Sequence, residues 1–270
     1  MNLKIFITIV AVLKCFCAVA QTHPQEFFDG LNNLTKDEPL AKKQLLIAAS
    51  KEPDFYGTYH FLGVISQNNN QLDSAIYYYK KSVDLNTENV NHTREMAYSR
   101  LIIALLYKHD IKNAFDAAWE ACKAYPESKG LEKNLGDVCL WAYYTKHNGL
   151  NLDYLAPAIK VEYVVNSIPE EYLIVRYLKL NNEPLNVAGQ SLVHKGSGSY
   201  DVLKCVTASK AEATVNCKIN WDMGKEFGGK TGPVAKVLAD KSLPVYERAG
   251  AVLVNNAKAD IKKEVQSMLN

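Results

Sequence analysis

The chain has 270 residues, of which 48% are hydrophobic and 22% are charged, and its formal charge is +2 at pH 7. A chain of this length can bury one large core or two modest ones, and no long Gly/Ser/Pro-rich linker marks a division. The 31 basic and 29 acidic residues nearly balance and form no basic block, which excludes a protein that binds nucleic acid mainly by charge.

The first 20 residues have the pattern of a secretory signal peptide. Lys4 supplies a positive charge, residues 5–13 are apolar, and Ala-Val-Ala precedes Gln21 as a small-x-small cleavage site. A membrane anchor needs about 20 predominantly apolar residues, and Lys14 interrupts this stretch. We therefore expect a periplasmic or secreted protein with no membrane span after cleavage. Removing the two lysines leaves 29 basic residues against 29 acidic ones, so the mature chain is neutral.

Small residues then recur at matched offsets along the first half of the chain. The three sets begin at Ala41, Ala75 and Ala114, which lie 34 and 39 residues apart, the second interval being 34 plus a five-residue insertion. A residue at the closest crossing of two antiparallel helices must be small, and residues three or four apart share a helix face. The period of 34 predicts stacked helix pairs, which we place at residues 22–55, 56–89 and 95–128, followed by a single helix at 129–146.

This segment resembles tetratricopeptide repeats, since YHFLG at 59–63 and NLG at 134–136 match the signature of the first helix of each repeat. The resemblance implies that the first helices line a concave groove that holds an extended peptide or a helix of a partner protein. The matching positions imply nine groove contacts: His60, Gln67, Asn68, Ser99, Ile103, Tyr107, Lys133, Asp137 and Trp141. The alternative is a stacking scaffold whose groove is covered by the second half of the chain.

The second half of the chain, residues 151–270, has a different pattern. Residues 152–165 are ambiguous between helix and strand, EEYLIVRYLKL at 170–180 is typical of a helix, and residues 185–221 alternate as in a β-meander with a turn at GSGS, 196–199. Further helices are expected at about 234–241 and 257–269. We therefore expect an α+β protein, in which a helical array at 22–146 precedes a small antiparallel-sheet domain.

The two cysteines of the meander can be placed by register. An antiparallel hairpin centred on Ala211 puts Leu203 opposite Ile219 and Cys205 opposite Cys217, with both cysteines on the apolar face. In an oxidising compartment such a pair forms either a disulfide or two buried thiols. Both alternatives stay open at this point.

A second resemblance covers part of this domain. The run from EEY at 170–172 through GQSLVHKG at 189–196 to SYDVLK at 199–204 is similar to an uncharacterised domain family of secreted bacterial proteins. The matching residues have the pattern of structural positions, namely alternating residues of strands and a turn between them. The resemblance implies no activity.

The stretch GKEFGGKT at 224–231 matches the pattern G-x-x-x-x-G-K-[ST] of phosphate-binding loops. A working loop of that kind follows a buried parallel strand and opens a helix. Here the preceding residues alternate between polar and apolar, as in a half-exposed antiparallel strand. We interpret the stretch as a Gly-rich loop that leaves the sheet, and we expect no nucleotide or other cofactor.

No coherent catalytic or metal-binding constellation emerges from the sequence. The six histidines are scattered without an H-E-x-x-H spacing, and no C-x-x-C occurs, so no metal site is expected. We hypothesise an exported, non-catalytic module that binds a protein or peptide, or assists envelope assembly, through the repeat groove. The alternative is an envelope hydrolase in which the side chains of His194, Asp201 and Ser191 lie close together. If these three side chains point apart, the hydrolase hypothesis has no candidate catalytic residues.

Overall fold

The computed structural model describes residues 23–196, 198–220, 233–256 and 259–270. The expected signal peptide and the Gly-rich motif at 224–231 lie outside these residues. The chain divides into two compact units, one made of residues 1–108 and 116–131 and the other of residues 109–115 and 132–270. Each unit is described separately below.

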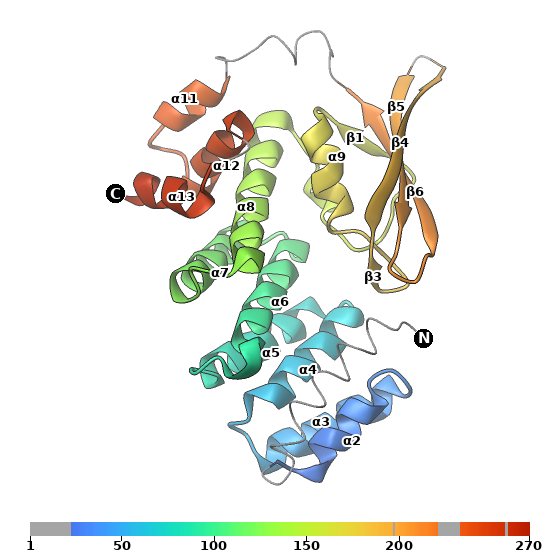
Figure 1. The fold of residues 1–270 in the computed structure, drawn as a ribbon, viewed down its shortest axis with the longest axis vertical. Coiled ribbons are helices and arrows are strands. Elements are labelled where there is room, and N and C mark those ends of the chain that lie inside the picture. The colour runs from blue at the N-terminus through green and yellow to red at the C-terminus, as the bar shows by residue number, and fades with distance from the viewer. Residues whose placement is uncertain (1–22, 197, 221–232, 257–258) are drawn as a thin grey trace. The chain divides into compact units, whose positions relative to one another are not determined.

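The first unit is an array of helices that pack in sequence order (Figure 1). Helices α2 and α3 pack together, as do α4 and α5, and the contacts continue from α3 to α4 and from α5 to α6. Their bounds confirm the helix positions predicted from the period of 34. The helices are α2 (Gln25–Asn33), α3 (Glu38–Lys51), α4 (Tyr56–Asn68), α5 (Leu72–Leu85) and α6 (Thr93–Tyr107), with a short 3-10 turn η1 (Val90–His92) before α6. The next helix, α7 (Ile111–Ala124), is shared: residues 111–115 group with the second unit and residues 116–124 with the first.

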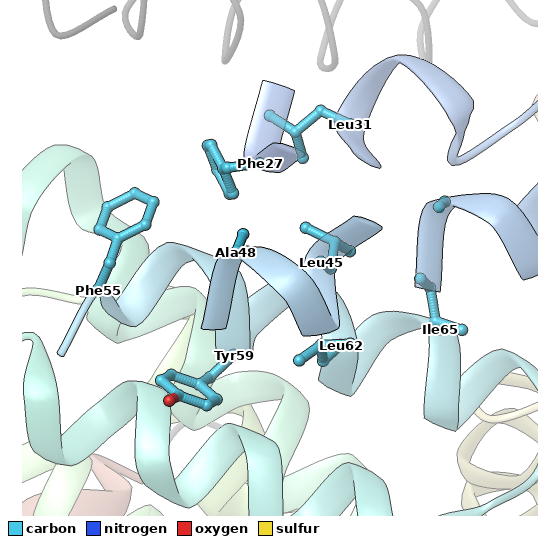
Figure 2. Close-up of a cluster of buried hydrophobic side chains, with 9 residues drawn as sticks. Phe27, Leu31, Leu45, Ala48, Phe55, Tyr59, Leu62 and Ile65 are labelled. Carbon is cyan, nitrogen blue, oxygen red and sulfur yellow. The ribbon is translucent and has the colours of Figure 1, made fainter. Parts of the chain in front are cut away.

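The recurring small residues are buried in the structure. Ala41, Ala75 and Ala114 are completely buried, as expected of residues at helix crossings. Around the first two pairs, large side chains fill the remaining space and form one cluster from α2, α3, α4 and the turn before α4 (Figure 2). Its members are Phe27, Leu31, Ala41, Leu45, Ala48, Phe55, Tyr59, Leu62 and Ile65.

The second unit combines helices with a mixed sheet, which confirms the α+β class. The sheet has the strand order β1-β6-β5-β4, in which β4, β5 and β6 form the predicted meander and β1 pairs with β6 in parallel. The sequence left the segment containing β1 ambiguous, and the expected helix at 170–180 is shorter, because the chain turns into a strand after it. The elements are α8 (Lys129–Tyr143), η2 (Tyr144–Asn148), η3 (Leu152–Tyr154), β1 (Tyr163–Val165), α9 (Ile168–Val175), β2 (Lys179–Leu180), β3 (Glu183–Pro184), β4 (Asn186–Lys195), β5 (Gly198–Val206) and β6 (Glu212–Ile219).

The predicted register of the hairpin between β5 and β6 is wrong by four residues. Cys205 lies opposite Ala213, and Cys217 lies opposite Asp201. A four-residue offset separates the two cysteines by about 13 Å along the strands, given a rise of about 3.3 Å per residue, whereas a disulfide requires Cα atoms within about 7 Å. Both are buried free thiols. The even offset kept both cysteines on the buried face, so the pattern of faces alone could not reveal the error.

Three helices complete the second unit: α11 (Pro233–Ala239), α12 (Val245–Asn255) and α13 (Ile261–Leu269). The first and last agree with the predicted helices, and Val265 on α13 is fully buried as its apolar stripe implies. Helix α12 was not predicted, because a central glycine and several valines give poor helix propensity. Tertiary packing forms it instead: Gly250 lies so close to α8 that an added Cβ would be 2.5 Å from Tyr143 Cβ and nearer still to the carbonyl oxygen of Cys139.

Candidate functional site

Two buried polar side chains on α4, His60 and Gln67, lie on one face of the helix because they are seven residues apart. Each is only 7% exposed. The hydroxyl of Tyr79 on α5 donates a hydrogen bond to Gln67 Oε1 at 2.9 Å. Gly63 makes this possible, since a Cβ there would lie 2.5 Å from Cε1 of the tyrosine ring. A glycine on α4 thus allows Tyr79 to approach and orient Gln67.

One side-chain nitrogen of Gln67 and one of His60 make no hydrogen bond within the described part of the chain. Gln67 Nε2 and His60 Nδ1 are buried, and no hydrogen-bond partner for either lies among the described residues. Leaving a buried polar group without a partner costs about 1–3 kcal/mol. The amide nitrogen can only donate, and a neutral imidazole also carries one N–H. Gln67 Nε2 is therefore a donor without an acceptor on the inner side of α4, and the role of His60 Nδ1 depends on the tautomer of the ring.

Arg100 on α6 supplies a positive charge beside these groups. Burial, with a smaller effect from the Arg100 charge, lowers the pKa of His60 to about 3, so the imidazole is neutral near pH 7. The Arg100 charge also opposes the rise that burial causes in the pKa of Tyr79 and Tyr107. The described residues supply Arg100 with no hydrogen bond or ion pair. Arg100 is thus a partly buried residue with no counter-charge among the residues that the structure describes.

The other expected contacts of the first unit lie near this arginine or at the end of α4. Ile103 and Tyr107 share a face of α6 with Arg100, being three and seven residues away, and Ile103 is partly buried while Tyr107 is buried. Ser99 is partly buried and Asn68, at the end of α4, is exposed. The sequence reasoning missed Arg100. The sequence does contain a signal for it, because the spacing of Arg100 to Ile103 and Tyr107 places all three on one face of a helix.

The three expected contacts on α8 have different roles. Trp141 is fully buried and Asp137 is 4% exposed, which contradicts the prediction that both side chains face a partner. Asp137 accepts hydrogen bonds from Arg176 and, at 3.3 Å, from the Tyr177 hydroxyl. Trp141 makes an edge-on contact with the Tyr177 ring at 6.0 Å between centroids. Only Lys133 is exposed.

Asp137 is a charged group inside the second unit. Burial raises the pKa of its carboxyl, and the nearby charges of Arg176 and Lys133 oppose that rise. The charged partner and the tyrosine hydroxyl satisfy its oxygens. The contact joins α8 to the end of α9, so Asp137 belongs to the core of this unit.

The residues of the hydrolase alternative do not converge. His194 Nδ1 lies 2.9 Å from Ser199 Oγ on β5, and Asp201, two residues further along β5, points to the same face. Ser191 is three residues from His194 on β4, so its side chain points to the opposite face. On the described strands Ser191 therefore lies out of reach of His194, and the hydroxyl that contacts this histidine is that of Ser199.

Within the residues that the structure describes, no three His, Cys, Asp or Glu side chains gather closely enough to hold a metal ion. No helix in the same part of the chain is long and apolar enough to cross a membrane. In comparisons with known proteins, no family model matches the chain, and no curated protein matches it.

Proposed function

We propose that the chain is an exported, non-catalytic binding module that holds a protein or peptide against helices α4 and α6 of its first unit. One observation carries the proposal: two buried nitrogens on α4 and the partly buried Arg100 on α6 lack hydrogen-bond partners in the described chain. These helices are the ones that the resemblance to tetratricopeptide repeats assigns to a groove. The two nitrogens on α4 are closed off from solvent, so the half-buried Arg100 is the group of this set that an acceptor on a bound partner would meet.

The test is site-specific photocrosslinking in cells. A photoreactive amino acid replaces the exposed Asn68 at the end of α4, and a matched variant carries it at Tyr77 on α5, which is 59% exposed. We expect a discrete protein adduct from position 68 and none from position 77. The same adducts from both positions, or none from position 68, would contradict the proposed binding surface.

Export is tested separately. We expect the mature chain to begin at Gln21, and an Ala20→Phe substitution to block cleavage by removing the small residue that signal peptidase requires. The measurement is the intact mass of tagged protein from fractionated cells. A chain that retains Met1 and stays in the cytosolic fraction would contradict export.

A further inference from the structure

The sheet of the second unit ends on one side in a long strand. In the order β1-β6-β5-β4, strand β4 lies at an edge and, among the described strands, pairs only with β5 (Figure 1). Strand β4 has ten residues, whereas β1 at the opposite edge has three. An edge strand presents a row of backbone N–H and C=O groups that can pair with another chain. Strand β4 is therefore the larger of the two edges that can do so.

The features that usually protect a long edge strand are sparse in residues 190–195. Proteins protect such edges with proline, charged side chains or a bulge. The irregularity in the pairing of β4 lies between Val187 and Gly189, before this stretch. The stretch contains no proline, and its one Lys, Arg, Asp or Glu residue is Lys195 at the end. All six residues are exposed, so this part of the edge is open to a second strand.

Two large apolar side chains lie in the same stretch. Leu192 is 46% exposed and Val193 is 42% exposed, and as neighbours in a strand they point to opposite faces of the sheet. Leu192 lies opposite Asp201, which is only 7% exposed, so it belongs to the covered face and yet remains half exposed at the edge. A strand added beside β4 would cover apolar surface on both faces, because directly opposite side chains of paired strands are in contact.

We infer that β4 pairs in antiparallel fashion with β4 of a second copy of this chain, so that two four-stranded sheets become one continuous sheet. A two-fold axis makes such an interface self-complementary, and the pairing can therefore be read from a single sequence. An axis at Leu192 places the two Leu192 side chains opposite each other. The same register places Ser191 opposite Val193, and Lys195 opposite Gly189.

The charges along the strand favour a second copy as the occupant. In this register the apolar pair lies at the centre and each Lys195 faces a glycine, so no like charges are opposed. At about 3.3 Å per residue, the two Lys195 residues lie about 20 Å apart along the strands. This separation exceeds the Debye length of about 8 Å at physiological ionic strength, so their repulsion is screened. Pairing over residues 189–195 is smaller than a standard interface, and we expect a weak dimer with a Kd between about 10 μM and 1 mM.

Sedimentation equilibrium of the mature chain tests the inference. Leu192→Lys places two ammonium groups opposite each other at the axis, and like charges directly opposite destabilise strand pairing. We expect the Kd of the dimer to rise at least about tenfold. Val254→Lys is the matched control, because Val254 is 38% exposed on α12, outside the sheet, and its Kd should equal that of the wild type. Circular dichroism establishes that both variants are folded.

A charge exchange tests the register. Leu192→Lys and Leu192→Glu should each dimerise weakly alone, whereas their equimolar mixture should dimerise at least about tenfold more tightly, because opposite charges then meet at the axis. A mixture no tighter than its components, or a folded Leu192→Lys variant that dimerises like the wild type, would overturn the inference.

A wild type that stays monomeric up to about 1 mM would leave the edge to a strand of a different protein and would also overturn the inference. Neither result bears on the binding surface proposed for α4 and α6, because the sheet belongs to the other unit.

Discussion

Arg100 is partly buried and Asp137 is almost completely buried. The two residues differ in whether neighbouring side chains compensate their charge. Asp137 is buried with Arg176 and the Tyr177 hydroxyl bonded to it, so its charge is compensated within the second unit. Arg100 has no such partner in the described chain. Because uncompensated charges are costly away from water, the compensated Asp137 indicates a structural role, whereas the half-buried Arg100 is the residue for which we propose a binding role.

His60 makes the stability of the first unit depend on pH. Its pKa is lowered to about 3 in the folded chain, against about 6.5 in an unfolded chain. Between these values the unfolded state binds more protons, so stability is lost as pH falls below about 6.5. Relative to His60→Gln, we expect the wild type to lose about 2 kcal/mol between pH 7 and pH 5, measured by urea unfolding. Parallel pH profiles for the two proteins would contradict a buried neutral histidine.

The Asp137–Arg176 pair is expected to be strongly coupled. Removing the guanidinium in Arg176→Met leaves a buried carboxylate with less compensation, and we expect a loss of about 2 kcal/mol, reduced from the value for a fully buried pair because Arg176 is partly exposed. The double variant Asp137→Asn, Arg176→Met should lose less than the sum of the single variants. Additive losses in urea unfolding would show that the two side chains do not interact.

At the scale of elements, close helix packing depends on what surrounds each small residue. Gly250 on α12 faces the backbone of α8, whereas Gly136 on α8 faces the flexible end of Ile261 on α13. A backbone cannot move aside as a side-chain terminus can, so the two glycines should differ in their tolerance of a methyl group.

We expect Gly250→Ala to destabilise the second unit by about 2–3 kcal/mol through overpacking. Gly136→Ala is the matched control and should lie within about 1 kcal/mol of the wild type, because the helix propensity of alanine offsets a small shift of Ile261. Thermal unfolding followed by circular dichroism measures both. Equal losses would show that α12 does not pack on α8 through this glycine.

The register of β5 and β6 predicts the chemistry of the two strand cysteines. Burial raises the pKa of the Cys205 and Cys217 thiols, so the reactive thiolate is scarce in the folded protein. We expect neither to react with iodoacetamide under native conditions and both to react after unfolding without reductant. Peptide mapping measures this, and a peptide pair linked through these two cysteines would contradict the register.

At the scale of the whole molecule, the division into units does not follow the sequence repeat. The period of 34 assigned α8 to the helical array, and NLG at 134–136 suited that assignment. From Glu132 onward α8 groups with the second unit, because Asp137 and Trp141 contact the end of α9 and the segment that follows it. A repeat signature describes the surface of one helix, and it does not specify which neighbour covers that surface.

The sequence by itself determined the paired helices, the meander and the α+β class. Spacing of small residues and alternation of apolar residues are local patterns that fix element type and buried face. Only the tertiary structure decided the hairpin register, the existence of α12, the burial of Trp141 and the position of Arg100 beside His60. Each of these depends on contacts between segments far apart in the chain, and their free energies are not encoded in the periodicity of either segment alone.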